Sequence, residues 1–200
     1  MYTLSAHNPR LIYNVQADWP ERSRVLKELE SLPWAYTSGF KQRARVETHD
    51  EHSQALDSTP TLKHIVTTLR NSQHDFLTYM YTNEEFNKHI WPGTTLEQLL
   101  NNTSTVCELY RDDPGWLTGI HIDHRAAVAT GMLFFEPKLD KRKATYFYTT
   151  EKAKNELCMD NTYSRGWYAA NTHRSWHTGG NMGKDFRYSL LFAQFLKLPT

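Results

Sequence analysis

Residues 118–127, TGIHIDHRAA, are the stretch on which the fold prediction turns, because they place two histidines and an aspartate within four positions. In a β-strand successive side chains point to opposite faces, so His121 and Asp123 would share one face while Ile122 and His124 share the other. One face would then carry an imidazole beside a carboxylate, and both groups are common metal ligands. A catalytic metal needs a further ligand from elsewhere in the chain.

The stretch NTHRSWHTGGN at residues 171–181 supplies two candidates for that ligand, His173 and His177. Together with His121 and Asp123, either histidine would complete a set of two histidines and one carboxylate, the facial triad that leaves coordination positions open on Fe(II). Open positions are typical of a catalytic metal site rather than a structural one.

The second half of the chain reads as a series of strands. From about residue 104, short aromatic and β-branched runs alternate with turns. These runs are STVCELY, WLTGIHID, AVATGMLFF, ATYFYTT, GWYAANT and FRYSLLFAQFL. The basic run KRK at residues 141–143 lies between two of them, and we expect it to form a solvated hairpin turn.

The first half carries helical patterns instead. Apolar residues recur at helical spacing over residues 25–32 and 62–69. We expect Asp18 with Glu21 to cap the first helix, and the second helix to follow Thr59 and Pro60 and to end near Asn71. DFLTYMY, in residues 75–81, fits a strand or a helix, and TLEQLL at residues 95–100 indicates a short helix. The sequence thus predicts one α+β domain over residues 1–200, with a mainly helical part at 1–103 that buttresses a jelly-roll core at 104–196.

Composition favours a small, local ligand. Hydrophobic residues make up 39% of the chain, which indicates a globular protein, and 23 basic against 22 acidic side chains give no global field that would steer nucleic acid or a membrane surface. No apolar run has the length of a signal peptide or a membrane span, so we expect a soluble cytoplasmic protein. Cys107 and Cys158 fit no zinc or redox spacing and are expected to be reduced packing residues. The oligomeric state is left open.

Three stretches together resemble the iron(II)- and 2-oxoglutarate-dependent dioxygenases, a family that includes prolyl hydroxylases and has a double-stranded β-helix (jelly-roll, cupin-like) fold. DDPGWLTGIHIDH is similar to the strand with the family's H-x-D motif, RSWHTGG to its distal histidine, and RYSLLF to its R-x-S strand. Their order along the chain is also the family's. The match covers roughly residues 104–195, and residues 1–100 match no motif.

The resemblance implies roles for individual residues. His121, Asp123 and His177 would be the iron ligands, with His177 preferred over His173 because WHTGG and the ten-residue step to Arg187 fit the family pattern. Arg187 and Ser189 would bind the distal carboxylate of the co-substrate 2-oxoglutarate. Tyr110 is a further candidate for that pocket. KRKATYFY lacks the paired glycines that many members have before Thr145, so that threonine is given no role.

The implied reaction is an oxidation by O2 that releases succinate and CO2, most simply the hydroxylation of a small metabolite or amino-acid-like substrate. Asp123 disfavours halogenation, since halogenating relatives have glycine or alanine there. A protein side chain as substrate remains open. Two other classes also remain: a zinc-dependent hydrolase using the same ligands, which is weakened by Gly119 in place of the first histidine of an H-x-H-x-D-H run, and a non-enzymatic jelly-roll binding protein.

The other histidines and tryptophans, which the resemblance gives no role at the metal, are expected to have structural or surface roles. His124 would point away from the metal, and the histidines at positions 49, 52, 64, 74 and 89 fall among polar residues and helical segments. Trp167 and Trp176 are expected in the core rather than in a substrate cage.

Overall fold

The structure is a computed structural model that describes residues 2–5, 10–15, 17–36, 39, 41–48, 54–83, 94–124, 126–152, 156–163, 165–170 and 175–197, with backbone alone for residues 2–5 and 10–13. Its helices are α1 (Arg22–Ser31), α2 (Pro60–Asn71), α3 (Gln73–Thr82) and α5 (Leu96–Asn102), with 3-10 turns η1 (Gln54–Leu56) and η2 (Lys141–Lys143). Its strands are β1 (Tyr2–Ser5), β2 (Arg10–Val15), β3 (Ala35–Tyr36), β4 (Arg43–Glu47), β5 (Thr103–Asp112), β6 (Trp116–Leu117), β7 (Ala127–Phe134), β8 (Thr145–Tyr148), β9 (Leu157–Cys158), β10 (Gly166–Ala170), β11 (Trp176–Asn181) and β12 (Arg187–Leu196).

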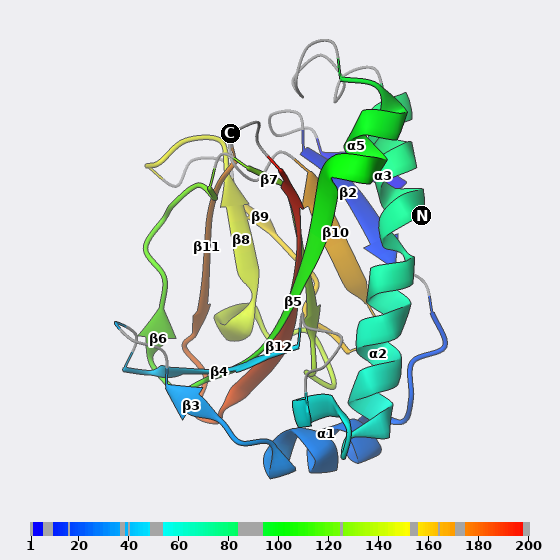
Figure 1. The fold of residues 1–200 in the computed structure, drawn as a ribbon. Coiled ribbons are helices and arrows are strands. Elements are labelled where there is room, and N and C mark those ends of the chain that lie inside the picture. Colours follow the sequence, from blue (N-terminus) through cyan, green and yellow to red (C-terminus); the bar gives the residue numbers. More distant parts are fainter. Residues whose placement is uncertain are drawn as a thin grey trace.

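The strands form two antiparallel sheets. The large sheet has the order β1-β2-β10-β7-β12-β5-β4-β3, and the small sheet has the order β6-β11-β8-β9. In Figure 1 helices α2, α3 and α5 lie along one side of the large sheet, and β8 and β11 of the small sheet lie on its other side. The architecture is therefore a two-sheet jelly roll with helices against its outer face.

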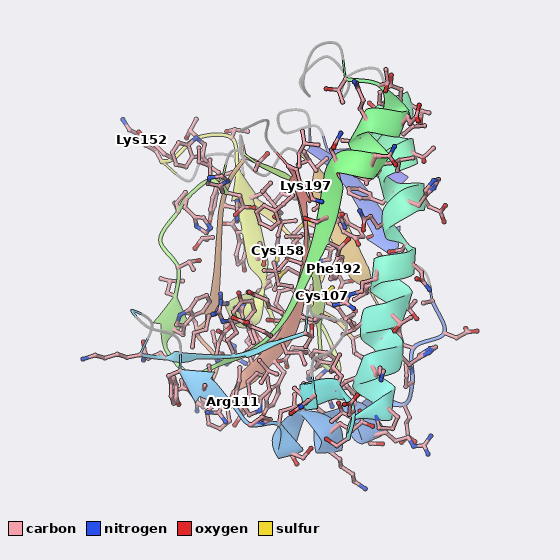
Figure 2. All side chains as sticks on the ribbon, in the orientation of Figure 1. Cys107, Arg111, Lys152, Cys158, Phe192 and Lys197 are labelled. Atoms are coloured by element: carbon pink, nitrogen blue, oxygen red, sulfur yellow. The ribbon has the colours of Figure 1, made fainter. Side chains whose placement is uncertain are left out.

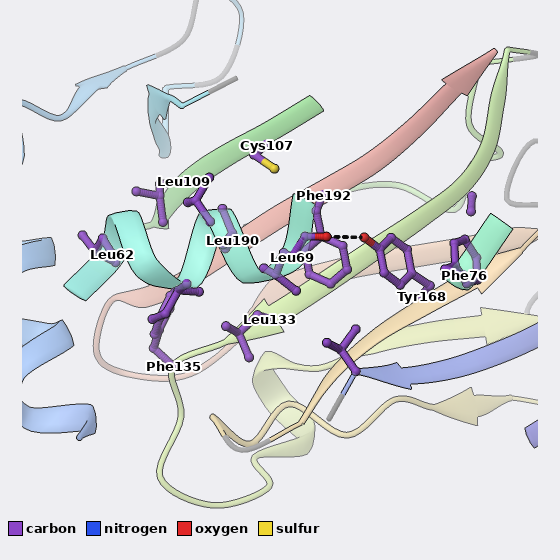
Figure 3. Packing of buried hydrophobic residues seen from close by; sticks show 14 of the residues in the cluster. Leu62, Leu69, Phe76, Cys107, Leu109, Leu133, Phe135, Tyr168, Leu190 and Phe192 are labelled. Carbon is purple, nitrogen blue, oxygen red and sulfur yellow. Dashed lines mark hydrogen bonds between the residues drawn. The ribbon is translucent and has the colours of Figure 1, made fainter. Parts of the chain in front are cut away.

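Strand alternation divides the large sheet into a helix side and an inter-sheet side. On β5, Cys107 and Leu109 belong to the cluster that packs against α2 and α3, whereas Tyr110 lines a cavity on the opposite face. Figure 3 shows the helix-side packing, in which the hydroxyl of Tyr168 donates a hydrogen bond to the carbonyl of Leu69. Because one face of the large sheet packs against the helices, the cavity lies on its other face.

A second apolar cluster fills part of the space between the sheets. Met132, Phe134 and Trp167 from the large sheet pack with Phe147 of β8. This cluster lies beside the cavity, because Met132, Phe147 and Trp167 also line it. One wall of the cavity is thus apolar, and polar side chains can line the rest.

Gly131 of β7 is required by packing across the helix-side face. It pairs with Phe192 of β12, and a Cβ atom at this position would lie 2.0 Å from Cε2 of the Phe192 ring. Such a distance is far inside van der Waals contact, so the ring and β7 can approach only because residue 131 is glycine.

The predicted helices are found, with one error at the first. Helix α2 spans Pro60–Asn71 as predicted, DFLTYMY lies in helix α3, and α5 begins with a capping box at Thr95. The capping box at Asp18 was wrong: α1 has Glu21 at its N-cap, without a side-chain cap, and the Glu21 carboxylate accepts a hydrogen bond from Ser23 instead.

Three further features differ from the sequence-based expectation. Residues 1–103 also contribute strands β1–β4, which extend both edges of the large sheet. The predicted strand WLTGIHID is regular only at Trp116–Leu117; His121 forms a single bridge to His177, and Asp123 lies outside the regular strands. The KRK run is not a solvated turn throughout, because Lys143 is buried and its Nζ lies 3.1 Å from Glu136.

Two simpler expectations concern the thiols and the membrane. Cys107 and Cys158, both labelled in Figure 2, are free thiols, as expected. Among the described helices, none combines the length and apolar character that crossing a membrane would need.

Candidate functional site

Three potential metal ligands meet where the two predicted motifs come together. In the described part of the chain, ligand atoms of His121, Asp123 and His177 all lie within 4.8 Å of one another. The backbones of His121 and His177 exchange two hydrogen bonds, of 2.9 and 2.8 Å, which bring the two histidines together. The Asp123 Oδ1 atom lies 3.9 Å from Nε2 of His121 and 3.5 Å from Nε2 of His177.

Hydrogen bonds to the backbone orient both imidazoles. Nδ1 of His121 lies 2.9 Å from the carbonyl of Gly119, and Nδ1 of His177 lies 2.8 Å from the carbonyl of Ser175. A carbonyl oxygen only accepts, so in each ring Nδ1 carries a proton, and Nε2 is the nitrogen that can present a lone pair to a metal. The lone pairs and the Asp123 carboxylate are all electron donors, and their convergence favours a cation at the centre.

Asp123 is held from its other side. The Thr130 hydroxyl donates a 2.6 Å hydrogen bond to Oδ2 of Asp123, so Oδ1 is turned toward the histidines. Outer hydrogen bonds of this kind, on both the imidazoles and the carboxylate, are the usual supports of protein metal ligands. The three side chains differ in exposure: 43% of the His121 side chain is exposed, compared with 9% for His177. The group is therefore reached from the His121 side.

A cavity of about 170 Å³ adjoins the three side chains, which form part of its wall. This volume lies below the range of about 300–1,000 Å³ for sites that take drug-sized ligands. The cavity therefore suits a small molecule. Arg43 and Arg187 also line it, so a cationic wall and a potential metal site share one space.

Arg187 is buried in this wall and only partly satisfied. It is 1% exposed; Nε and Nη2 donate to Oδ2 of Asp112 at 2.9 and 2.5 Å, and Nη1 donates to the carbonyl of Lys143 at 2.9 Å. Burial lowers the pKa of Arg187, while the Asp112 carboxylate opposes that shift. A guanidinium has five N–H donors, so three have acceptors among the described residues and two are left for a ligand.

Ser189 carries an orphaned hydroxyl on the same strand face. The residue is fully buried, and its Oγ has no hydrogen-bond partner among the described residues. Because side chains alternate along β12, Ser189 lies on the inter-sheet face between Arg187 and Leu191. Both neighbours line the cavity, whereas Ser189 itself is not among the lining residues. A buried hydroxyl without a partner costs about 1–3 kcal/mol. Such a cost is explained if a ligand group supplies the partner.

Comparison with known proteins gives a match in structure alone. No profile of a known protein family matches the chain, and no curated protein matches it in sequence. Among solved structures it is similar to a Trichoplax adhaerens prolyl hydroxylase in complex with a peptide fragment of the hypoxia inducible factor oxygen degradation domain (TM-score 0.60, 12% identity, covering 95% of this chain and 84% of that one). The chain has the fold of the iron(II)/2-oxoglutarate oxygenases.

Two other oxygenases extend this comparison. The chain is similar to AtDAO1, the dioxygenase for auxin oxidation from Arabidopsis thaliana, in its complex with 2-oxoglutarate (TM-score 0.59, 10% identity, 94% and 84% of the two chains). It is also similar to SnoN, an α-ketoglutarate-dependent epimerase of nogalamycin biosynthesis (TM-score 0.56, 11% identity, 92% and 77%). The predicted double-stranded β-helix is therefore confirmed. At these identities the likeness extends to the fold, which is shared by a hydroxylase and an epimerase.

Within this oxygenase fold, Tyr110 lines the cavity but its hydroxyl has a protein partner. The hydroxyl donates a hydrogen bond to Glu108, and burial, reinforced by Glu108, raises the pKa of Tyr110. The donor that a carboxylate would need is therefore directed away from the cavity. The role of Tyr110 at the co-substrate stays a prediction with less support than those of Arg187 and Ser189.

The remaining sequence candidates lie mostly away from the three potential metal ligands. His124 is exposed, and its Nδ1 accepts a hydrogen bond from the backbone of Ala126. His173 lies outside the described residues, as do the histidines at 49, 52 and 89, while His64 and His74 are exposed. Trp167 is buried as expected and also lines the cavity.

Sequence reasoning missed three residues at the cavity and its wall. Thr145, which was given no role, is buried and lines the cavity. Arg43 comes from β4 in the half of the chain without motifs, and Asp112 links it to Arg187. The alternation of RARVE at residues 43–47 was the one signal available, because it places Ala44 and Val46 in the core and the arginines on the opposite face.

Proposed function

We propose that the protein is an Fe(II)- and 2-oxoglutarate-dependent dioxygenase that hydroxylates a small metabolite or an amino-acid-like substrate and releases succinate and CO2. The observation that carries this proposal is the convergence of two imidazole Nε2 atoms and one carboxylate oxygen, each oriented by a hydrogen bond at its other end. The shared oxygenase fold supports the general kind of enzyme.

His121, Asp123 and His177 are the residues that would hold the iron. Two neutral imidazoles and one carboxylate are the donor set of non-heme Fe(II) oxygenases, and three protein ligands leave positions open. When bound, the iron supplies the redox chemistry that couples the oxidation of substrate by O2 to the decarboxylation of 2-oxoglutarate. The hydrogen bonds from Thr130 and to Gly119 and Ser175 fix the ligand orientations in advance, so little ordering remains for metal binding.

Arg187 and Ser189 would bind the distal carboxylate of 2-oxoglutarate. Arg187 has two N–H groups left to donate to a carboxylate, and the orphaned hydroxyl of Ser189 would supply a further donor. Met132, Phe147 and Trp167 give the cavity an apolar wall that limits water around the reacting groups. The cavity therefore combines charge at one wall with apolar packing at another.

The primary substrate would approach from the side of His121, whose side chain is the most exposed of the three ligands. A small metabolite is favoured by the near-neutral charge of the chain. A peptide side chain is the competing substrate class, because one similar structure is a prolyl hydroxylase in complex with a peptide. The cytoplasmic location expected from the sequence stays a prediction.

The test is turnover by the purified protein with Fe(II), 2-oxoglutarate and O2, measured as succinate formed against panels of amino acids, small metabolites and proline-containing peptides. We expect iron-dependent succinate formation that one substrate class stimulates, and none from Asp123→Ala. A zinc-loaded sample assayed for hydrolysis is the matched control. Absence of succinate at stoichiometric iron, with or without substrates, would contradict the proposal and favour a binding protein; hydrolysis by the zinc form would favour a hydrolase.

A further inference from the structure

Arg43 is a cationic residue of the cavity that lies outside every motif of the sequence. It is on β4, which pairs with β5 in the large sheet, and its side chain lines the same cavity as Arg187. The side chain is 17% exposed. Its guanidinium carbon lies 4.1 Å from the ring centre of Tyr110 and 3.6 Å from that of Trp116. Two aromatic contacts therefore hold the guanidinium in place.

One carboxylate joins Arg43 to Arg187. Asp112 is fully buried, and it accepts hydrogen bonds from Nε and Nη2 of Arg43 at 2.6 and 3.1 Å as well as from Nε and Nη2 of Arg187. Because both Nη2 atoms bond to Oδ2 of Asp112, at 3.1 and 2.5 Å, they are at most about 6 Å apart. Asp112 thus faces two positive charges with one negative charge.

The proximity of the two guanidiniums has an electrostatic consequence. The positive charge of Arg43 acts to lower the pKa of Arg187, because the two cations repel each other in a buried setting. An anion that enters the cavity beside Arg187 is attracted by both cations and relieves part of this repulsion. The wall is therefore better suited to a carboxylate than a single arginine would be.

We infer that Arg43 is a second cationic group of the co-substrate pocket and that it helps select a keto acid with a distal carboxylate over one without. The inference rests on the proposed function and adds a residue from the N-terminal half of the chain to that site. Arg43 acts through its charge beside the carboxylate, while Arg187 and Ser189 supply the hydrogen bonds. Its effect is therefore expected on dicarboxylate keto acids only.

Arg45 provides a matched control on the same strand. It lies two residues along β4 on the same face, and it pairs with Glu47 and Glu108. Its side chain is 38% exposed, and it is absent from the cavity wall formed by the described residues. Arg45→Gln thus removes one positive charge from the same strand without altering a residue that lines the cavity.

The experiment is an anaerobic titration of the Fe(II)-loaded protein, followed by the iron–keto-acid charge-transfer absorption, with calorimetry on the Mn(II)-loaded protein as a second readout. Wild type, Arg43→Gln, Arg43→Lys and Arg45→Gln are titrated with 2-oxoglutarate and with 2-oxopentanoate, which lacks the distal carboxylate. We expect Arg43→Gln to weaken 2-oxoglutarate binding by about 5- to 50-fold, which is the effect of removing a unit charge when the carboxylate binds about 6 Å from it, at effective dielectric constants of roughly 25 to 60. Arg43→Lys should recover part of the loss.

The outcomes separate this inference from the proposed function. Unchanged 2-oxoglutarate binding by Arg43→Gln, an equal loss in Arg45→Gln, or an equal loss for 2-oxopentanoate would overturn the inference while the proposed function stands. Comparable binding of 2-oxopentanoate by wild type and Arg43→Gln shows that the variant is folded and that its defect is specific to the distal carboxylate. If wild type binds neither keto acid, the proposed function itself fails, and the inference fails with it.

Discussion

Replacing Ser189 by alanine should stabilise the fold and weaken co-substrate binding at the same time. The hydroxyl of Ser189 is fully buried without a partner among the described residues, on the face that lines the cavity. Its removal relieves the cost of burying an unsatisfied polar group. The same hydroxyl is the donor that we assign to the distal carboxylate of 2-oxoglutarate, so the two effects have opposite signs.

The magnitudes follow from these contacts. Relief of an unsatisfied hydroxyl is worth about 1–3 kcal/mol. For a chain of this size each kcal/mol shifts the unfolding midpoint by about 2–4 °C, so the ligand-free protein should gain about 2–12 °C. Loss of one hydrogen bond to a charged group costs about 1.5–3 kcal/mol, which corresponds to a roughly ten- to hundredfold weaker affinity for 2-oxoglutarate.

One assay reads both effects. Thermal unfolding is followed with the Mn(II)-loaded protein, without 2-oxoglutarate and at several concentrations of it, since a ligand that binds the native state raises the midpoint by mass action. Without 2-oxoglutarate, Ser189→Ala should have a higher unfolding midpoint than wild type. Addition of 2-oxoglutarate should raise that midpoint less than it raises the midpoint of wild type. Ser104→Ala, on the neighbouring strand at an exposed position, is the control and should change stability by less than about 0.5 kcal/mol.

Two results would refute this reasoning. A lower midpoint for ligand-free Ser189→Ala would mean that the hydroxyl is satisfied in the folded protein. An unchanged response to 2-oxoglutarate, with or without stabilisation, would remove Ser189 from the co-substrate site.

Three further predictions concern individual side chains. Arg187→Ala should retain metal binding and weaken 2-oxoglutarate binding by roughly ten- to a hundredfold; an unchanged midpoint in the charge-transfer titration would remove Arg187 from the site. His177→Ala should lose Fe(II) affinity while His173→Ala keeps most of it, and metal titrations in the reverse order would reassign the distal ligand. Gly131→Ala should destabilise the fold by about 1–3 kcal/mol or more through its clash with Phe192, and wild-type stability in denaturant would contradict the packing described.

The site was more predictable than its surroundings, for a physical reason. Metal chemistry restricts residue type, so His121, Asp123 and His177 could be grouped from their identities before their geometry was known. The reasoning that placed His121 and Asp123 on one face of a strand was partly wrong, because only Trp116–Leu117 of the predicted strand WLTGIHID is a regular strand. What brings His121 to the group is its backbone pairing with His177, a long-range contact that local periodicity does not contain.

Charged residues in the wall were the least predictable part. Lys143 looked like one of three solvated basic residues, but it is buried against Glu136, and its carbonyl orients Arg187. Arg43 and Asp112 resemble ordinary surface residues in the sequence. The pairing of β4 with β5 and of β5 with β12 places Arg43 in the cavity wall and makes Asp112 its buried partner. The sequence of a strand does not reveal whether a charged side chain faces solvent or pairs with another buried charge.

The most direct test of the central claim is an anaerobic titration with Fe(II) alone, followed by 2-oxoglutarate, for wild type and Asp123→Ala. We expect wild type to bind one equivalent of iron and to show a saturable charge-transfer absorption when 2-oxoglutarate is added. Both should be lost in an Asp123→Ala protein that remains folded. Failure of wild type to bind iron, or wild-type iron binding by Asp123→Ala, would contradict the assignment of His121, Asp123 and His177 as the metal site.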